Sequence, residues 1–262
     1  MFERTTTLTQ TNQFDSHDEL LTEFFRRLKR QAPGSEAETN KVLATLSLEP
    51  KQSYTMLFHH CGTGALPLEM ATRYQGSIIA VDPRAELLDE FLVLSESMPL
   101  QASITATSDD VVELPVVKES LDLVWSQYPN HDSPFERVIQ HWNALLKPSG
   151  IVVLTELIWL TERKPLALTE YWNYSIKDIA TLEERLDQLE ANGFEVLHGD
   201  ILPEDCHTTN YYQPMSALFE SFMDEYNTPA AVGVVAELKH EISIYNKYNE
   251  YYGYAVFVAR KL

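Results

Sequence analysis

The sequence is poor in cysteine and in basic residues, and it has no long apolar run. Cys61 and Cys206 are its two cysteines, far apart and outside any paired spacing, so neither a disulfide framework nor a metal site is expected. Lys and Arg number 20 against 39 Asp and Glu, giving a formal net charge of -19. Such a charge opposes binding to a phosphate backbone, which argues against nucleic acid as a partner.

Targeting and membrane signals are also missing. No apolar run approaches the roughly 20 residues that cross a bilayer, and the start "MFERTTTLTQTNQFD" has neither a basic beginning nor an apolar centre. We therefore expect a cytoplasmic protein with no membrane partner.

The chain does contain a regular alternation of apolar strand candidates and amphipathic helices. With 262 residues, 44% of them hydrophobic, it fits one decorated α/β domain better than two independent ones. The strand candidates are "TMLFH", "GSIIAVD", "ASITAT", "LDLVWS", "GIVVLTE", "FEVLHGDIL" and "YGYAVFVAR". Nearly continuous apolar strands separated by helices predict a mainly parallel sheet with helices on both faces.

Helical segments flank this core. We expect a helical cap over residues 1–50, where Ser16 and Ser35 are placed to cap two helices. The expected core covers 51–202, a mainly helical insert or lid covers 203–249, and residues 250–262 return as the last strand. The insert must then lie over one end of the sheet.

The segment "FHHCGTGALPLEMA" carries the first chemical signal. An apolar strand, a glycine turn and a helix start place backbone N–H groups beside a bound anionic or polar group. Asp82 follows the second strand, where a carboxylate can accept hydrogen bonds from a ribose diol. Asp110 follows the third strand, near the place of an adenine amino group. Together these features predict an adenosine site.

The order of these segments resembles class I S-adenosylmethionine-dependent methyltransferases, whose first motif commonly reads "LD-(I/V)-GCGTG". The likeness covers nearly the whole chain. It is closest to bacterial small-molecule methyltransferases related to the ubiquinone/menaquinone-biosynthesis type, through "LKRQAPGS", "ELPVVKESLDLVWS", "FERVIQHWNALLKPSGIVVLTE", "LPEDCHTTNYYQP" and "YNKYNEYYGYAVFVARK". The resemblance implies a Rossmann-like class I methyltransferase fold, S-adenosyl-L-methionine as cofactor and a small-molecule methyl acceptor.

The resemblance also implies cofactor-binding residues, and it reveals two departures. It places Cys61, Gly62, Thr63 and Gly64 around the methionine moiety, Asp82 on the ribose, Asp110 and Val111 on adenine, and Trp125, Ser126 and Gln127 beside the transferable methyl. Phe58 stands where the family keeps an acid, and His60 replaces its first glycine. We hypothesise that His60 contacts the methionine end of the cofactor in place of the lost acid.

Candidate catalytic and lid residues follow from the chemistry of methyl transfer. A neutral acceptor needs a base, for which His131, His207 and Glu156 are candidates, although each also fits a structural or surface role. Trp159, Trp172, Tyr211 and Tyr212 are candidates for an aromatic lid over the sulfonium, with core packing as the alternative.

Two other functions stay open at this stage. The altered first motif also fits a degenerate adenosine-binding protein that has lost turnover. A nicotinamide-dependent oxidoreductase is less favoured, because the fingerprint G-x-G-x-x-G lacks its third glycine. The sequence allows a homodimer.

Overall fold

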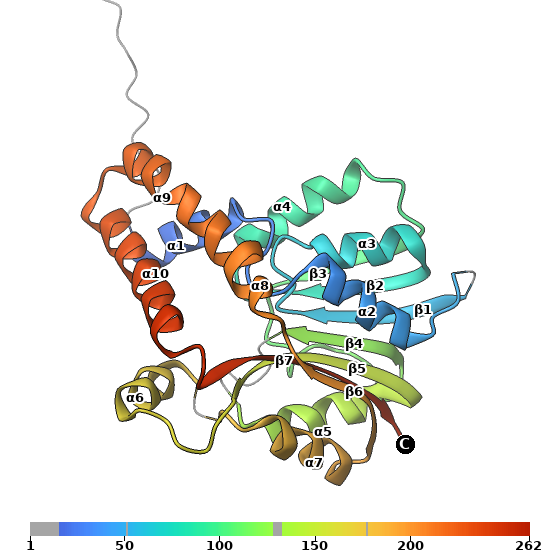
Figure 1. The fold of residues 1–262 in the computed structure, drawn as a ribbon. Coiled ribbons are helices and arrows are strands. Elements are labelled where there is room, and N and C mark those ends of the chain that lie inside the picture. The colour runs from blue at the N-terminus through green and yellow to red at the C-terminus, as the bar shows by residue number, and fades with distance from the viewer. Residues whose placement is uncertain (1–15, 51, 128–132, 177) are drawn as a thin grey trace, which may run out of the picture.

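The protein is built on one seven-stranded sheet with the strand order β3-β2-β1-β4-β5-β7-β6 (Figure 1). The computed structural model describes residues 16–50, 52–127, 133–176 and 178–262. The strands are β1 (Ser53–His59), β2 (Gln75–Val81), β3 (Ala102–Thr107), β4 (Leu121–Gln127), β5 (Leu146–Trp159), β6 (Phe194–Ile201) and β7 (Tyr252–Lys261). The pairs among β1 to β5 are parallel, whereas β7 runs antiparallel to β5 and β6. The predicted mainly parallel sheet is confirmed.

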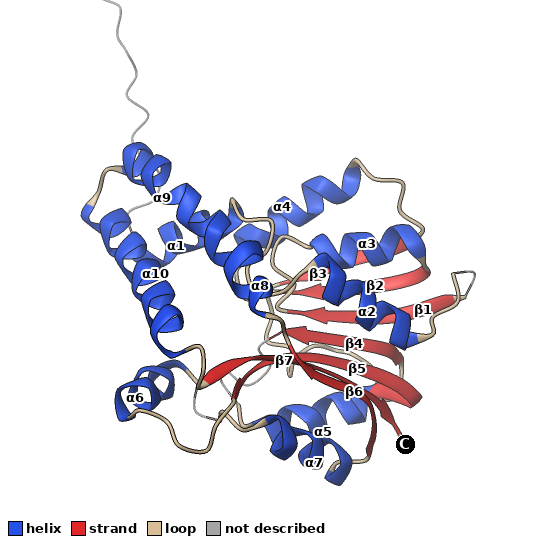
Figure 2. Ribbon diagram, viewed as in Figure 1, coloured by secondary structure: helices blue, strands red, loops and turns tan. Residues whose placement is uncertain are grey.

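Helices cover both faces of this sheet, as Figure 2 shows. One face carries α2 (Glu36–Leu46), α3 (Ala65–Arg73) and α4 (Ala85–Glu96), and the other carries α5 (Phe135–Leu145) and α7 (Leu182–Ala191). Strand alternation sends Val153 and Leu157 to the first face and Val152 and Leu154 to the second, where separate apolar cores form. This two-sided burial explains the nearly continuous apolar strands.

The remaining helices lie beyond the carboxyl ends of the parallel strands (Figure 1). They are α1 (His17–Arg26), α6 (Leu166–Ser175), α8 (Glu204–His207), the π-helical turn η1 (Thr208–Tyr212), α9 (Gln213–Tyr226) and α10 (Pro229–Tyr248). Ser16 caps α1 in a capping box with Glu19, and Ser35 caps α2, as predicted.

The N-terminal helix and the insert are held to each other. Phe24 of α1 packs against Phe219 and Phe222 of α9, with ring centroids 5.8 and 5.0 Å apart. Arg27 makes a bidentate ion pair of 2.8 and 2.9 Å with Glu225. These contacts join segments about 200 residues apart in sequence into one helical layer over the strand ends. Among the described residues, no helix combines the length and the apolar character needed to cross a membrane.

Candidate cofactor and acceptor site

A cavity of about 1040 Å³ lies between the strand ends and the helical layer. From the strand ends it is lined by His59, His60, Gly62, Asp82, Asp110, Val111 and Gln127. From the helices it is lined by residues that include Phe25, Arg84, Tyr171, Trp172, Tyr211, Leu238 and Glu241. Its volume is at the upper end of single-ligand pockets, so it has room for a cofactor and a small second ligand.

The glycine turn between β1 and α3 forms one wall of this cavity. Gly62 and Gly64 have φ angles of +57° and +78°, which favour glycine. A Cβ atom on Gly64 would lie 2.0 Å from the Phe91 ring of α4, and one on Gly62 would lie 2.2 Å from Gln31 Oε1. The turn is thus packed from both sides, and neither glycine has room for a side chain.

Asp82 fixes the turn from the tip of β2. Its Oδ2 accepts the Gly62 N–H at 2.8 Å and its Oδ1 accepts the Arg84 N–H at 3.0 Å. Only 5% of the residue is exposed, and this burial raises the carboxyl pKa while the two N–H bonds oppose the rise. A carboxylate offers about four lone-pair directions, so each oxygen retains capacity toward the cavity.

Asp110 and Val111 lie after β3 on the same side of the cavity as Asp82. Asp110 is exposed, and its Oδ1 accepts the Val112 N–H at 3.0 Å. The carboxyl ends of neighbouring parallel strands meet at one sheet edge, which brings Asp82 and Asp110 into one cavity wall as the sequence indicated.

The two histidines of the opening motif have different surroundings. His59 Nδ1 lies 2.8 Å from Ser126 Oγ, and burial lowers the His59 pKa to about 4, so its imidazole is neutral at pH 7. His60 adopts a left-handed φ of +54°, and its ring centroid lies 4.2 Å from that of His59. Both line the cavity. Phe58, by contrast, is buried against Trp125 on the far side of β1 from His59.

Several predicted cofactor residues do not line the large cavity. Cys61, Thr63, Gly64, Trp125 and Ser126 are absent from its lining. Cys61 packs beside the core around Phe91, and burial raises the pKa of its thiol. Thr63 donates its N–H to Gln31 Oε1 at 3.3 Å, and Ser126 is fully buried beneath His59.

The candidate bases are not gathered at the cavity. His131 lies outside the described residues. His207 is 2% exposed, is stacked on Tyr245 with ring centroids 4.7 Å apart, and has its pKa lowered to about 4 by burial. Glu156 is fully buried on the sheet face covered by α7, where Arg185 Nε donates to its Oε2 at 2.8 Å. Neither His207 nor Glu156 is among the cavity-lining residues.

Half of the predicted lid residues line the cavity. Trp172 of α6 and Tyr211 of η1 are in its wall. Trp159 is instead packed in the core with Lys164 Nζ 4.7 Å from its ring centroid, and Tyr212 donates its hydroxyl to Glu241 Oε1 at 3.1 Å. Tyr212 therefore acts on the cavity through Glu241.

The sequence reasoning missed Gln31 and Glu241. Gln31 Nε2 donates to the carbonyls of Phe25 and Leu28, at 3.1 and 2.8 Å, which holds its Oε1 over the glycine turn. The signal for Glu241 is its spacing. It occupies one position in the helical stripe Val234, Leu238, Glu241, Tyr245 and Tyr248, whose other members are buried.

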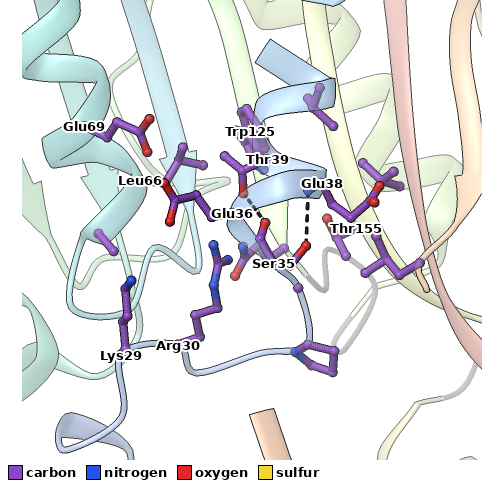
Figure 3. Close-up of a pocket in the computed structure, with 17 residues that line it drawn as sticks. Lys29, Arg30, Ser35, Glu36, Glu38, Thr39, Leu66, Glu69, Trp125 and Thr155 are labelled. Carbon is purple, nitrogen blue, oxygen red and sulfur yellow. Dashed lines mark hydrogen bonds between the residues drawn. The ribbon is translucent and has the colours of Figure 1, made fainter. Parts of the chain in front are cut away.

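A smaller cavity of about 280 Å³ adjoins the large one, and Gln127 lines both. Figure 3 shows Lys29 and Arg30 entering it from the segment before α2, near Glu36 and Glu69, with Trp125 and Thr155 also in its lining. Burial lowers the Arg30 pKa, and the charges of Glu36 and Glu69 oppose this. Its mixed charges suit a small polar group.

Comparisons with known proteins agree with this geometry. Residues 59–150 match a family described as "Methyltransferase domain". No protein of curated function matches the sequence. A Geobacter sulfurreducens S-adenosylmethionine-dependent methyltransferase, solved with S-adenosylhomocysteine, superposes with a TM-score of 0.80 at 17% identity, covering 93% of this chain and 98% of its own.

Two further solved structures are similar over most of this chain. Phosphoethanolamine N-methyltransferase 2 of Haemonchus contortus has a TM-score of 0.72 at 16% identity, over 94% of this chain and 57% of its own. The [4+2]-cyclase SpnF has a TM-score of 0.67 at 21% identity, and the match covers 93% of this chain and 92% of the cyclase. Kinship to the quinone-biosynthesis group stays a prediction. Residues 59–150 are thus similar to the methyltransferase domain family, and the chain has the class I methyltransferase fold.

Proposed function

We propose that the protein transfers a methyl group from S-adenosyl-L-methionine to a small-molecule acceptor. The observation that carries the proposal is Asp82, a buried carboxylate at the tip of β2 that is held by the Gly62 and Arg84 N–H groups and faces the large cavity. A ribose diol supplies two donors that suit its remaining lone pairs.

The rest of the cavity wall fits the other parts of this cofactor. Asp110 and Val111 are available to adenine, and His60 and Gln127 to the methionine end. S-adenosylmethionine supplies a methyl group on a positively charged sulfur. The protein's part is to align the acceptor with that group and to exclude water, which the buried rings of Trp172 and Tyr211 would favour.

Isothermal titration with S-adenosylmethionine, S-adenosylhomocysteine and NAD tests the cofactor. We expect the first two to bind and NAD not to bind. Asp82→Ala should weaken S-adenosylhomocysteine at least tenfold, because one hydrogen bond to a charged group contributes about 1.5–3 kcal/mol and about 1.4 kcal/mol is tenfold. Asp89→Ala is the matched control, since that carboxylate is exposed on α4 and lines neither cavity. Tight binding of NAD alone would overturn the proposal.

An adenosine-binding protein without turnover is the second candidate. Phe58 favours it, because this side chain is buried against Trp125 and leaves the acidic contact of the family without a counterpart at that position. The [4+2]-cyclase among the similar structures carries a different reaction on this fold. Transfer of a labelled methyl group to any compound in a metabolite extract would decide for the enzyme. The small-molecule acceptor, the cytoplasmic location and a homodimer stay predictions.

A further inference from the structure

The part of the large cavity formed by the helical layer has its own chemistry. Tyr171 and Trp172 come from α6, Tyr211 from η1, Tyr254 from β7 and Glu241 from α10. Trp172, Tyr211 and Tyr254 are each less than 10% exposed. Aromatic faces and a carboxylate in one partly enclosed space attract a cation.

Glu241 is the more buried of the two α10 carboxylates in this wall, and burial without a cation is costly for a carboxylate. It replaces an apolar residue in the buried stripe of α10, between Leu238 and Tyr245. Its Oε1 accepts the Tyr212 hydroxyl at 3.1 Å. Among the residues that the structure describes, no cationic side chain forms an ion pair with it. A partly buried carboxylate without a cation is expected to favour a positively charged ligand.

Among the described residues, the charged groups near Glu241 do not supply its carboxylate with a cationic partner. Glu237, one turn earlier on α10, pairs with His17 of α1 at 3.0 Å and lies at the cavity rim. Arg84 is stacked on Phe25 with its guanidinium carbon 5.1 Å from the ring centroid, and its charge acts on Tyr211. Glu237 adds negative charge beside Glu241, whose own charge also acts on the hydroxyls of Tyr171, Tyr211 and Tyr252.

Trp172 supplies an aromatic surface to the same wall. Its residue is 7% exposed, it lines the cavity, and its Nε1–H has no hydrogen-bond partner in the described part of the chain. Because that nitrogen is itself buried, the indole acts on the cavity through its ring, which lies 5.0 Å from the Tyr171 ring centroid. Glu241 and these two rings therefore give the wall a carboxylate and aromatic faces, the combination that attracts a cation.

We propose that the methyl acceptor is an aliphatic amine that enters as its ammonium ion and is held between these aromatic rings and Glu241. This inference rests on the proposed function and specifies the substrate class of the same site. The ammonium gives one proton to the Glu241 carboxylate, which frees the nitrogen lone pair. That pair forms a bond to the methyl carbon as the carbon–sulfur bond breaks and its electrons remain on sulfur. The products are a methylated ammonium ion and a neutral thioether.

The protonation of Glu241 agrees with this role. Burial raises the pKa of its carboxyl to about 7, and the nearby Glu237 charge acts in the same direction, while the Tyr212 hydrogen bond opposes them. Above that pH the carboxylate form dominates and can accept a proton, so methyl transfer should rise as the pH passes through about 7. Glu241→Gln should remove this rising limb of the pH profile.

Binding of choline and of its uncharged isostere 3,3-dimethylbutan-1-ol tests the cation site directly, since the two probes differ in charge and little in shape. Both are titrated by calorimetry into the full chain, with and without S-adenosylhomocysteine. We expect choline to bind at least tenfold more tightly, and Glu241→Gln to abolish this preference while leaving S-adenosylhomocysteine affinity unchanged. Glu220→Gln, an exposed carboxylate of α9 that lines neither cavity, is the matched control and should keep the preference.

The other outcomes separate the two proposals. Equal binding of the two probes, or a choline preference that survives Glu241→Gln, would overturn the amine site and leave the methyltransferase proposal standing. A Glu241→Gln protein that loses affinity for S-adenosylmethionine but not for S-adenosylhomocysteine would also overturn it, because the carboxylate would then serve the sulfonium. Failure of the wild-type chain to bind either cofactor form would instead overturn the proposed function.

Discussion

Replacement of Arg185 by methionine should greatly lower the free energy of unfolding and leave the cofactor site unchanged. Its guanidinium is fully buried, donates to Glu156 Oε2 at 2.8 Å and to Gln188 Oε1 at 2.7 Å, and lies with its carbon 4.2 Å from the Phe135 ring centroid. Arg185→Met leaves the Glu156 carboxylate buried without its cation. Breaking such a pair costs about 3–5 kcal/mol, a large part of the roughly 5–15 kcal/mol that stabilises a typical domain.

Urea unfolding measures this loss. With a slope of about 3 kcal/mol per molar, the midpoint should fall by roughly 1–1.7 M. The double variant Glu156→Leu/Arg185→Met is the control, and it should recover at least half of the lost midpoint, because an apolar pair of similar volume can replace a buried ion pair while the Arg185 contacts with Asp178 and Gln188 are still lost. Affinity for S-adenosylhomocysteine should be unchanged in both proteins. The structural role would be refuted if Glu156→Gln abolished methyl transfer while stability and cofactor affinity stayed normal.

Three further variants test other contacts. Gly64→Ala should lose about 2–4 kcal/mol of unfolding free energy in thermal or urea melts, because of its φ of +78° and the 2.0 Å Cβ contact, whereas Gly233→Ala in α10, where the nearest atom is 3.5 Å away, should be neutral or stabilising. Arg27→Ala should cost about 0.5–1 kcal/mol by the same melts, a modest loss because its bidentate partner Glu225 is half exposed, and the absence of any measurable loss would contradict the joining of cap and insert. His60→Gly should weaken S-adenosylmethionine in calorimetry while stability stays within about 1 kcal/mol, and unchanged affinity would refute its contact with the methionine end.

The sequence predicted which strand-end residues share the large cavity, because its signals for them are local. Asp82 and Asp110 each follow an apolar strand, and the carboxyl ends of neighbouring parallel strands share one sheet edge. The positions of Gly62 and Gly64 in the turn follow from the strand–glycine–helix order. The positions of the strands in the sequence were therefore enough to predict that these residues lie at one edge of the sheet.

The candidate bases show where local pattern was insufficient. Thr155 and Glu156 are adjacent in β5 and point to opposite sheet faces, so the same segment contributes one residue to the small cavity and one to a buried ion pair. His207 sits beneath Tyr245, which comes from a helix 38 positions later in the chain. Neither outcome can be read from neighbouring residues.

By itself, the sequence determined the order of strands and helices, the glycine turn and the acidic strand tips, since backbone preference and apolar periodicity act over a few residues. The tertiary structure decided which side chains share the cavity. Glu241 and Trp172 lie on separate helices far apart in the chain, and the fold brings both into one partly enclosed wall. Burial then sets the chemistry of Glu241, because the loss of water raises the pKa of its carboxyl.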